Sequence, residues 1–224
     1  MKAKGAVLPG SKRTETSPRI FAKTCSETFA RSIDVFGQQA PSEDRHSSDT
    51  ESNHSLKAGE AADVALEPPT LDDGRQLWAL ARISDLDVNS PYAYVLWCRD
   101  FAATSLVARD STGTIRGFVT GYVRPDAPDT YFLWQVAVDP AFRGRRLARR
   151  MLDRISSCIT ERGIRYLEAT VTPGNTASRA LFASFARARS AALSWTPLFD
   201  RGHFPAELPE QHEPEDLVRI GPLR

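Results

Sequence analysis

Residues 130–152 constrain the fold more than any other part of this chain. An apolar run, TYFLWQVAV, ends at residue 138, and a short loop leads into a helical pattern that starts among Arg143, Arg145 and Arg146. A helix N-terminus favours anions, because the backbone dipole places positive partial charge there. The arginine cluster therefore indicates either a solvent-exposed cationic face or a turn that binds an anion in the working protein.

Helix and strand patterns alternate from residue 68 onward. Thr70 precedes a helical pattern and Asp73 follows three residues later, which is typical of a capping box. Ser90 and Pro91 are typical of a second helix start. Further strands are predicted over 105–110, 114–123, 130–138, 165–172, 192–197 and 217–221, and further helices after 145 and over 175–188. This order predicts an α/β domain with a mixed sheet.

The first 66 residues have a different composition. They are rich in Ser, Thr, Ala and balanced charges, and residues 41–55 (PSEDRHSSDTESNHS) contain no large apolar side chain. Such a stretch buries too little apolar surface to offset the entropy of ordering the chain. We therefore predict a disordered N-terminal extension over 1–66 and one folded domain over 67–224.

Several classes of protein are disfavoured by composition. The formal net charge is +1, which gives no global field for nucleic acid or membrane, and the apolar runs are too short to span a bilayer. The N-terminus lacks the apolar core of a secretory signal. Cys25, Cys98 and Cys158 are scattered, without the spacing of a disulfide framework or a zinc site. These features predict a cytoplasmic protein without a metal, a membrane partner or a nucleic-acid partner.

The basic turn resembles the acetyl-CoA loop of the GCN5-related N-acetyltransferase (GNAT) family, Arg/Gln-x-x-Gly-x-Gly/Ala. The resemblance implies a mixed, mostly antiparallel sheet flanked by helices. Consecutive backbone N–H groups at a helix start cradle a pyrophosphate, and guanidinium groups add charge-assisted bonds. Arg146 departs from the family, which has glycine there. The matching residues are Arg143, Gly144, Arg145, Arg146, Leu147 and Ala148.

A second family feature lies in GNTASRALF, residues 174–182. By resemblance, Asn175 caps the helix and bonds the pantetheine arm, and Phe182 replaces a tyrosine that protonates the departing thiolate in many relatives. A thiol has a pKa near 8.5, so its thiolate leaves with little help. We expect water or another group in that role. The fold further implies that a strand bulge presents the N–H of Val136 to the developing oxyanion and that of Val138 to pantetheine.

Five dispersed segments over residues 67–223 also resemble the L-2,4-diaminobutyrate acetyltransferases of ectoine synthesis. They are LDVNSPYAYVL, RGFVTGYV, DTYFLWQVAVD, YLEATVTPGNTASRALF and HEPEDLVRIGP. A diamine with a carboxylate requires an acidic pocket with a few donors. The resemblance places Asp87, Asn89, Tyr92, Trp134 and Glu168 around the substrate, and His212 and Glu215 near the reacting amine.

Each of these residues also has an ordinary structural interpretation. Asp87 could cap a turn, Tyr92 and Trp134 could be core aromatics, and Glu168 could pair with an arginine. The HEPE segment, residues 212–215, could be a solvated loop. Relatives suggest a homodimer, and that expectation rests on resemblance alone.

The chemistry requires a base, because an alkylammonium has a pKa near ~10. Holding the amine neutral at pH 7 costs about 4 kcal/mol unless a base takes its proton during attack. We expect Glu215 to be that base, directly or through one water, with His212 orienting or relaying. Cys98 and Cys158 lie in predicted helices away from the substrate loops. Direct transfer in a ternary complex is therefore expected.

Other functions remain open at this level. The chain could acetylate another small amine, an aminoglycoside or a protein N-terminus. Arg146 and Phe182 leave room for a CoA-binding domain without catalysis. The helix over residues 143–154 could form a nucleic-acid contact, although no aromatic platform or second basic element accompanies it.

Overall fold

The computed structural model describes residues 64–84, 86–206 and 212–224. Residues 1–63 of the expected disordered extension lie outside the described residues. The last three residues of that extension belong to strand β1 (Val64–Glu67), which pairs antiparallel with β2. The sheet therefore begins at Val64, before the predicted domain boundary.

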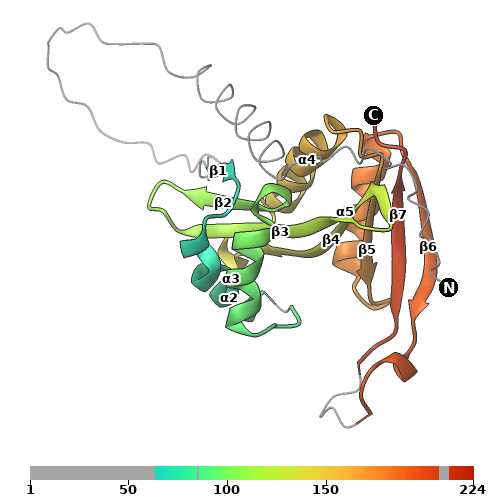
Figure 1. Cartoon of the computed structure of the whole chain (residues 1–224), viewed down its shortest axis with the longest axis horizontal. Helices are drawn as coiled ribbons and strands as arrows, with labels where there is room; N and C mark the ends of the chain where they lie inside the picture. Colours follow the sequence, from blue (N-terminus) through green and yellow to red (C-terminus); the bar gives the residue numbers. More distant parts are fainter. Residues whose placement is uncertain (1–63, 85, 207–211) are drawn as a thin grey trace, which may run out of the picture. The chain divides into compact units, whose positions relative to one another are not determined.

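One sheet of seven strands is formed by the described residues, in the order β1-β2-β3-β4-β5-β7-β6 (Figure 1). Adjacent strands are antiparallel except β4 and β5, which are parallel. The mixed, mostly antiparallel sheet that the resemblance implied is confirmed. The remaining strands are β2 (Leu106–Asp110), β3 (Ile115–Arg124), β4 (Ala127–Val138), β5 (Tyr166–Val171), β6 (Ala192–Phe199) and β7 (Glu215–Gly221).

Helices cover both faces of the sheet. Phe118 of β3 lies in one core cluster with Leu77 and Tyr94, whereas a side chain at the adjacent Gly117 would meet Met151 on the opposite face. Within the described part, no helix is long and apolar enough to cross a membrane. The helices are α2 (Gly74–Arg82), α3 (Pro91–Asp100), α4 (Leu147–Thr160) and α5 (Thr176–Ala188), with single 3₁₀ turns η1 (Leu71–Asp73), η2 (Ala102–Thr104), η3 (Pro140–Phe142) and η4 (Arg201–His203).

The 3₁₀ turn η1, which leads into α2, begins with the predicted capping box and is held by an ion pair that the sequence did not indicate. The N–H of Thr70 donates to Asp73 Oδ2 at 2.7 Å. Nη2 of Arg109 donates to both carboxylate oxygens of Asp73, at 3.0 and 2.9 Å, and its Nε donates to Glu67. β1 and the entry to α2 are thereby tied to β2.

β4 and β5 separate along their length. Only Thr130–Phe132 of β4 pairs with Tyr166–Glu168 of β5, and β4 continues to Val138 without a β5 partner. A bulge at Trp134 interrupts the pairing with β3, because Gly121 pairs with Leu133 while Thr120 pairs with Gln135. Bulges increase local twist and redirect side chains. The second half of β4 therefore has an open backbone edge.

Candidate active site

A cavity of about 600 Å³ lies at this open edge. It lies between the end of β4, the start of α4, the start of α5 and the segment that follows α2. All the residues expected to bind acetyl-CoA line it except Arg145, whose guanidinium lies over the Phe142 ring, 4.8 Å from its centroid. The expected residues that line it are Val136, Val138, Arg143, Gly144, Arg146, Leu147, Ala148 and Asn175.

The turn before α4 has the backbone shape of an anion cradle. Gly144 has φ 78° and Arg146 has φ 58° and ψ 20°, both in the left-handed region, and α4 begins at Leu147. Alternation of left- and right-handed residues makes consecutive N–H groups converge on one point. The first turn of α4 contains no acidic side chain that could occupy that point. The turn thus provides backbone donors and a helix N-terminus for a phosphate group.

Replacing Arg146 by glycine is expected to raise the free energy of unfolding by about 1 kcal/mol. A non-glycine residue in the left-handed region costs of order 1–3 kcal/mol. Glycine removes this cost, but its greater conformational freedom in the unfolded chain offsets part of the stabilisation. Urea unfolding without acetyl-CoA measures the change. Arg145→Gly is the control, since Arg145 is not among the residues with positive φ, and it should lower stability. A lower stability for Arg146→Gly would contradict the strain argument.

The backbone of β4 points its donors into the cavity. The N–H of Asp139 donates to the carbonyl of Arg116 in the β3 register at 2.9 Å. Successive strand residues direct their backbone groups to opposite edges. The N–H of Ala137 therefore faces β3, and those of Val136 and Val138 face the open edge. This orientation suits the donor roles expected for Val136 and Val138, and the observed bulge lies two residues before Val136.

The start of α5 forms the other wall of the cavity. Asn175 caps the helix as predicted, because its Oδ1 accepts the N–H of Ser178 at 2.9 Å. Phe182 is fully buried and offers no acid to this wall.

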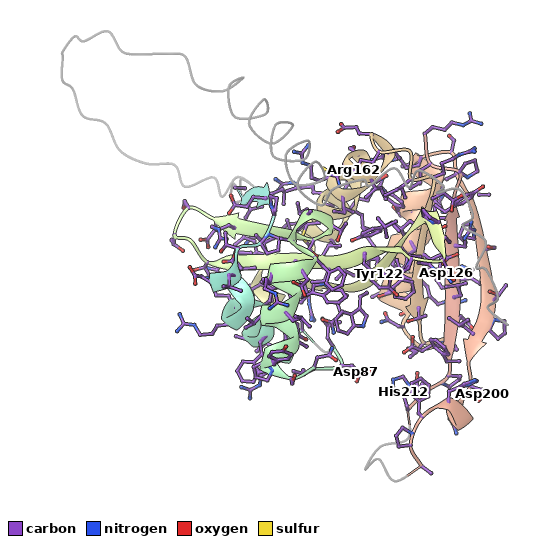
Figure 2. The ribbon with its side chains drawn as sticks, in the orientation of Figure 1. Asp87, Tyr122, Asp126, Arg162, Asp200 and His212 are labelled. Atoms are coloured by element: carbon purple, nitrogen blue, oxygen red, sulfur yellow. The ribbon has the colours of Figure 1, made fainter. Side chains whose placement is uncertain are left out.

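An acidic site joins two segments that are distant in the sequence. His212 Nε2 lies 3.2 Å from Asp87 Oδ2, and 3.7 Å from Glu215 Oε1. Asp87 lies between α2 and α3, and Glu215 is the first residue of β7. Figure 2 shows Asp87 and His212 approaching each other from these two parts of the fold. Three residues expected to act on the substrate are thus brought together.

His212 is held in a fixed orientation. Its ring stacks on Phe204, with centroids 3.8 Å apart and an interplanar angle of 11°. Its Nδ1 lies 2.7 Å from the carbonyl oxygen of Glu213. The hydrogen bond to Glu213 and the neighbouring Asp87 and Glu215 carboxylates raise the pKa of His212 above its usual value, against a smaller opposing effect of burial.

Gln135 is a functional candidate that the sequence analysis missed. Its Nε2 donates to the backbone carbonyl of Asp87 at 2.9 Å, and only 7% of the residue is exposed. The amide therefore ties the strand that lines the cavity to the loop that carries Asp87. The sequence feature that could have identified it is a glutamine within an otherwise apolar strand.

Two expected aromatic residues are on the surface. Tyr92, in the first turn of α3, is 71% exposed, and Trp134 is 37% exposed. The Trp134 ring packs against Trp97 of α3, with centroids 4.2 Å apart. The alternative that both are core aromatics does not hold. Asn89 is half-buried on the loop before α3.

Glu168 has a different environment from the one expected of a substrate ligand. Its side chain is 3% exposed, and its carboxylate binds two guanidinium groups, Arg124 Nη1 at 2.8 Å and Arg219 Nη1. These arginines come from β3 and β7, on either side of β4 and β5. An ammonium group would have to displace them to reach this carboxylate. In this structure Glu168 forms an ion pair that links strands, and its contact with substrate stays a prediction.

Side-chain chemistry argues against a covalent intermediate on Cys98 and against a nucleic-acid contact on α4. Burial, with a smaller contribution from Asp73, raises the pKa of the Cys98 thiol to about 11, so this group is a poor nucleophile at neutral pH. Arg149 of α4 pairs with Asp153 at 2.9 Å, which partly neutralises the cationic face of that helix. Among the described residues, no cluster of His, Cys, Asp or Glu is arranged to hold a metal ion.

Comparison with known proteins agrees with the fold. The model of the acetyltransferase (GNAT) family matches residues 72–186. An L-2,4-diaminobutyric acid acetyltransferase of Streptomyces coelicolor is 54% identical over 164 residues, covering 72% of this chain and 95% of the relative. A protein of the same name from Marinococcus halophilus is 39% identical over 165 residues, covering 74% of this chain and 94% of the relative.

Solved structures give the same result. The diaminobutyrate acetyltransferase of Paenibacillus lautus, in complex with its substrate L-2,4-diaminobutyric acid and coenzyme A, has a TM-score of 0.67 and 36% identity, over 72% of this chain and 96% of that chain. The ribosomal-protein-S18-alanine N-acetyltransferase of Escherichia coli, at 16% identity and a TM-score of 0.54 over 72% of this chain and 96% of that chain, shares the fold alone. The chain belongs to the GNAT family of acetyltransferases and, within it, to the L-2,4-diaminobutyric acid acetyltransferases.

Proposed function

We propose that this protein transfers an acetyl group from acetyl-CoA to the γ-amine of L-2,4-diaminobutyrate. One observation carries the proposal: strand β4 belongs to both halves of the site. Val136 lines the cavity beside the phosphate cradle, and the adjacent Gln135 holds the loop of Asp87. A cofactor in the cavity and an amine at the acidic site would thus meet at one strand.

The cavity fits coenzyme A by the chemistry of its lining. The N–H groups around Arg146 and the guanidinium of Arg143 suit a pyrophosphate, and Asn175 suits the pantetheine arm. When bound, acetyl-CoA supplies the activated acetyl group. The N–H of Val138 would hold pantetheine, and that of Val136 would donate to the oxygen on which negative charge develops.

The acidic site would hold and deprotonate the diamine. We assign Asp87, with Asn89 and Tyr92 beside it, to the α-ammonium and carboxylate, and Trp134 to the wall of the pocket. Glu215 would then take the γ-ammonium proton, directly or through one water, with His212 as relay. The thiolate leaves without a tyrosine acid, since Phe182 occupies that position and water suffices for a group of low basicity.

Thiol release with a panel of diamines tests the proposal. The kcat/KM for diaminobutyrate is expected to exceed those for ornithine and lysine by about 100-fold, because a nitrogen displaced by one or two methylene groups misses the acetyl carbon. Acetyl-CoA without a diamine, and aminoglycosides or an N-terminal peptide in its place, complete the panel. Equal rates with all three diamines would reject the assignment.

The cellular setting belongs to the same proposal. The product would be the precursor of ectoine, a compatible solute for osmoprotection. We propose a cytoplasmic homodimer without nucleic-acid or membrane partners, with a folded domain that follows an N-terminal extension. Buried Cys98 and Cys158 suit a reducing compartment. Sedimentation of the full chain tests the dimer, and a DNA shift assay at two salt concentrations tests nucleic-acid binding.

A further inference from the structure

The hydrogen bonds of His212 define its charge. A carbonyl oxygen only accepts, so Nδ1 must carry a hydrogen to bond Glu213 at 2.7 Å. A carboxylate likewise only accepts, so Nε2 must carry a hydrogen to bond Asp87 at 3.2 Å. Both contacts are hydrogen bonds only when each ring nitrogen carries a hydrogen, so this geometry favours the imidazolium form of His212.

This cation is placed between two carboxylates. Among the described residues, the charged groups that face Nε2 are Asp87, from the loop between α2 and α3, and Glu215, from β7. Phe204 covers one face of the ring and is uncharged. A diamine substrate brings two ammonium groups, and each requires a carboxylate partner.

We propose that, in the free enzyme, the His212 imidazolium occupies the cation position that the diamine takes on binding, and that binding expels the Nε2 proton. The α-ammonium takes Asp87 and the γ-ammonium takes Glu215. The imidazolium then faces two ammonium groups instead of two carboxylates, which disfavours its charge. The Nε2–H bond breaks, the proton goes to solvent, and the electron pair stays on nitrogen.

This inference rests on the proposed function and deepens it. Expulsion of the proton leaves Nε2 with a lone pair, 3.7 Å from the Glu215 carboxylate in the structure. Neutral His212 is then ready to receive the proton that Glu215 takes from the γ-amine. Substrate binding would therefore prepare the relay before transfer begins.

Calorimetry counts the expelled proton. Diaminobutyrate is titrated into the full chain saturated with coenzyme A, which carries no acetyl group, in buffers of different ionisation enthalpy at pH 6. The pH lies below the ordinary histidine pKa of about 6.5, and the pKa of His212 is raised further. Release should approach one proton per bound diamine. The Kd for diaminobutyrate should fall by up to about tenfold for each unit by which the pH rises, over the range in which His212 of the free enzyme is protonated.

His212→Gln and His203→Gln separate the sources of the proton. The glutamine amide at 212 retains a donor for Asp87 without titrating, so proton release and the pH dependence of Kd should be lost. His203 lies on the same connection but pairs with Asp200, so His203→Gln should behave like wild type. Two outcomes overturn this inference alone. In one, wild type acetylates diaminobutyrate but binds it without releasing a proton; in the other, His212→Gln releases as many protons as wild type. Absence of thiol release from wild type rejects the proposed function and this inference with it.

Discussion

Glu215→Gln is expected to lower kcat by about 10²- to 10⁴-fold, the usual contribution of a positioned general base. The amide has the shape of the carboxylate but cannot accept a proton at neutral pH. Glu215 does not line the cavity, so the affinity for acetyl-CoA should be unchanged. Single-turnover thiol release measures the transfer step, and calorimetry with coenzyme A measures binding.

Glu213→Gln is the matched control for this prediction. Its carboxylate lies towards Gly174, and only its backbone carbonyl contacts His212. Activity should stay within about threefold of wild type, since the catalytic contacts keep their partners. A Glu215→Gln enzyme with wild-type kcat would show that the amine loses its proton by another route.

Glu168→Gln is expected to lower the free energy of unfolding by about 2 kcal/mol. Loss of one partner from a fully buried ion pair costs about 3–5 kcal/mol. The effect is smaller here because Arg124 and Arg219 are 34% and 38% exposed and regain water. Urea unfolding of the full chain measures the loss.

Asp126→Asn tests whether burial causes that effect. Asp126 pairs with the same Arg124 at 2.7 Å, but its side chain is 70% exposed. Its loss should change stability by less than about 0.5 kcal/mol. The KM for diaminobutyrate distinguishes a structural role of Glu168 from a role in binding the substrate. A structural ion pair leaves KM unchanged in the folded enzyme, whereas a tenfold rise would restore Glu168 as a substrate ligand.

The expected elements of the α/β domain were found because their signals are local. Thr70 and Asp73 mark a helix start through a hydrogen bond within one turn, and Pro91 is the first residue of α3, where the ring of proline suits the helix. Asn175 caps α5 through a residue three positions away. The arginine-rich turn before α4 is local for the same reason, so its residues except Arg145 were found together at the cavity.

The site on the substrate side could be predicted only in part. Resemblance named Asp87, His212 and Glu215, but the contact between Asp87 and His212 joins positions 125 residues apart. No periodicity predicts such a contact, because it depends on where β7 enters the sheet. The link from Gln135 to the Asp87 loop has the same origin.

The sequence by itself determined where the helices, the strands from β2 onward and the arginine-rich turn lie, because turns, caps and side-chain periodicity act over a few residues. Tertiary structure alone decided that β1 joins the sheet, that β4 and β5 separate, and that Glu168 pairs with Arg124 and Arg219. These outcomes depend on strand order and register, which are set by long-range packing of the whole sheet.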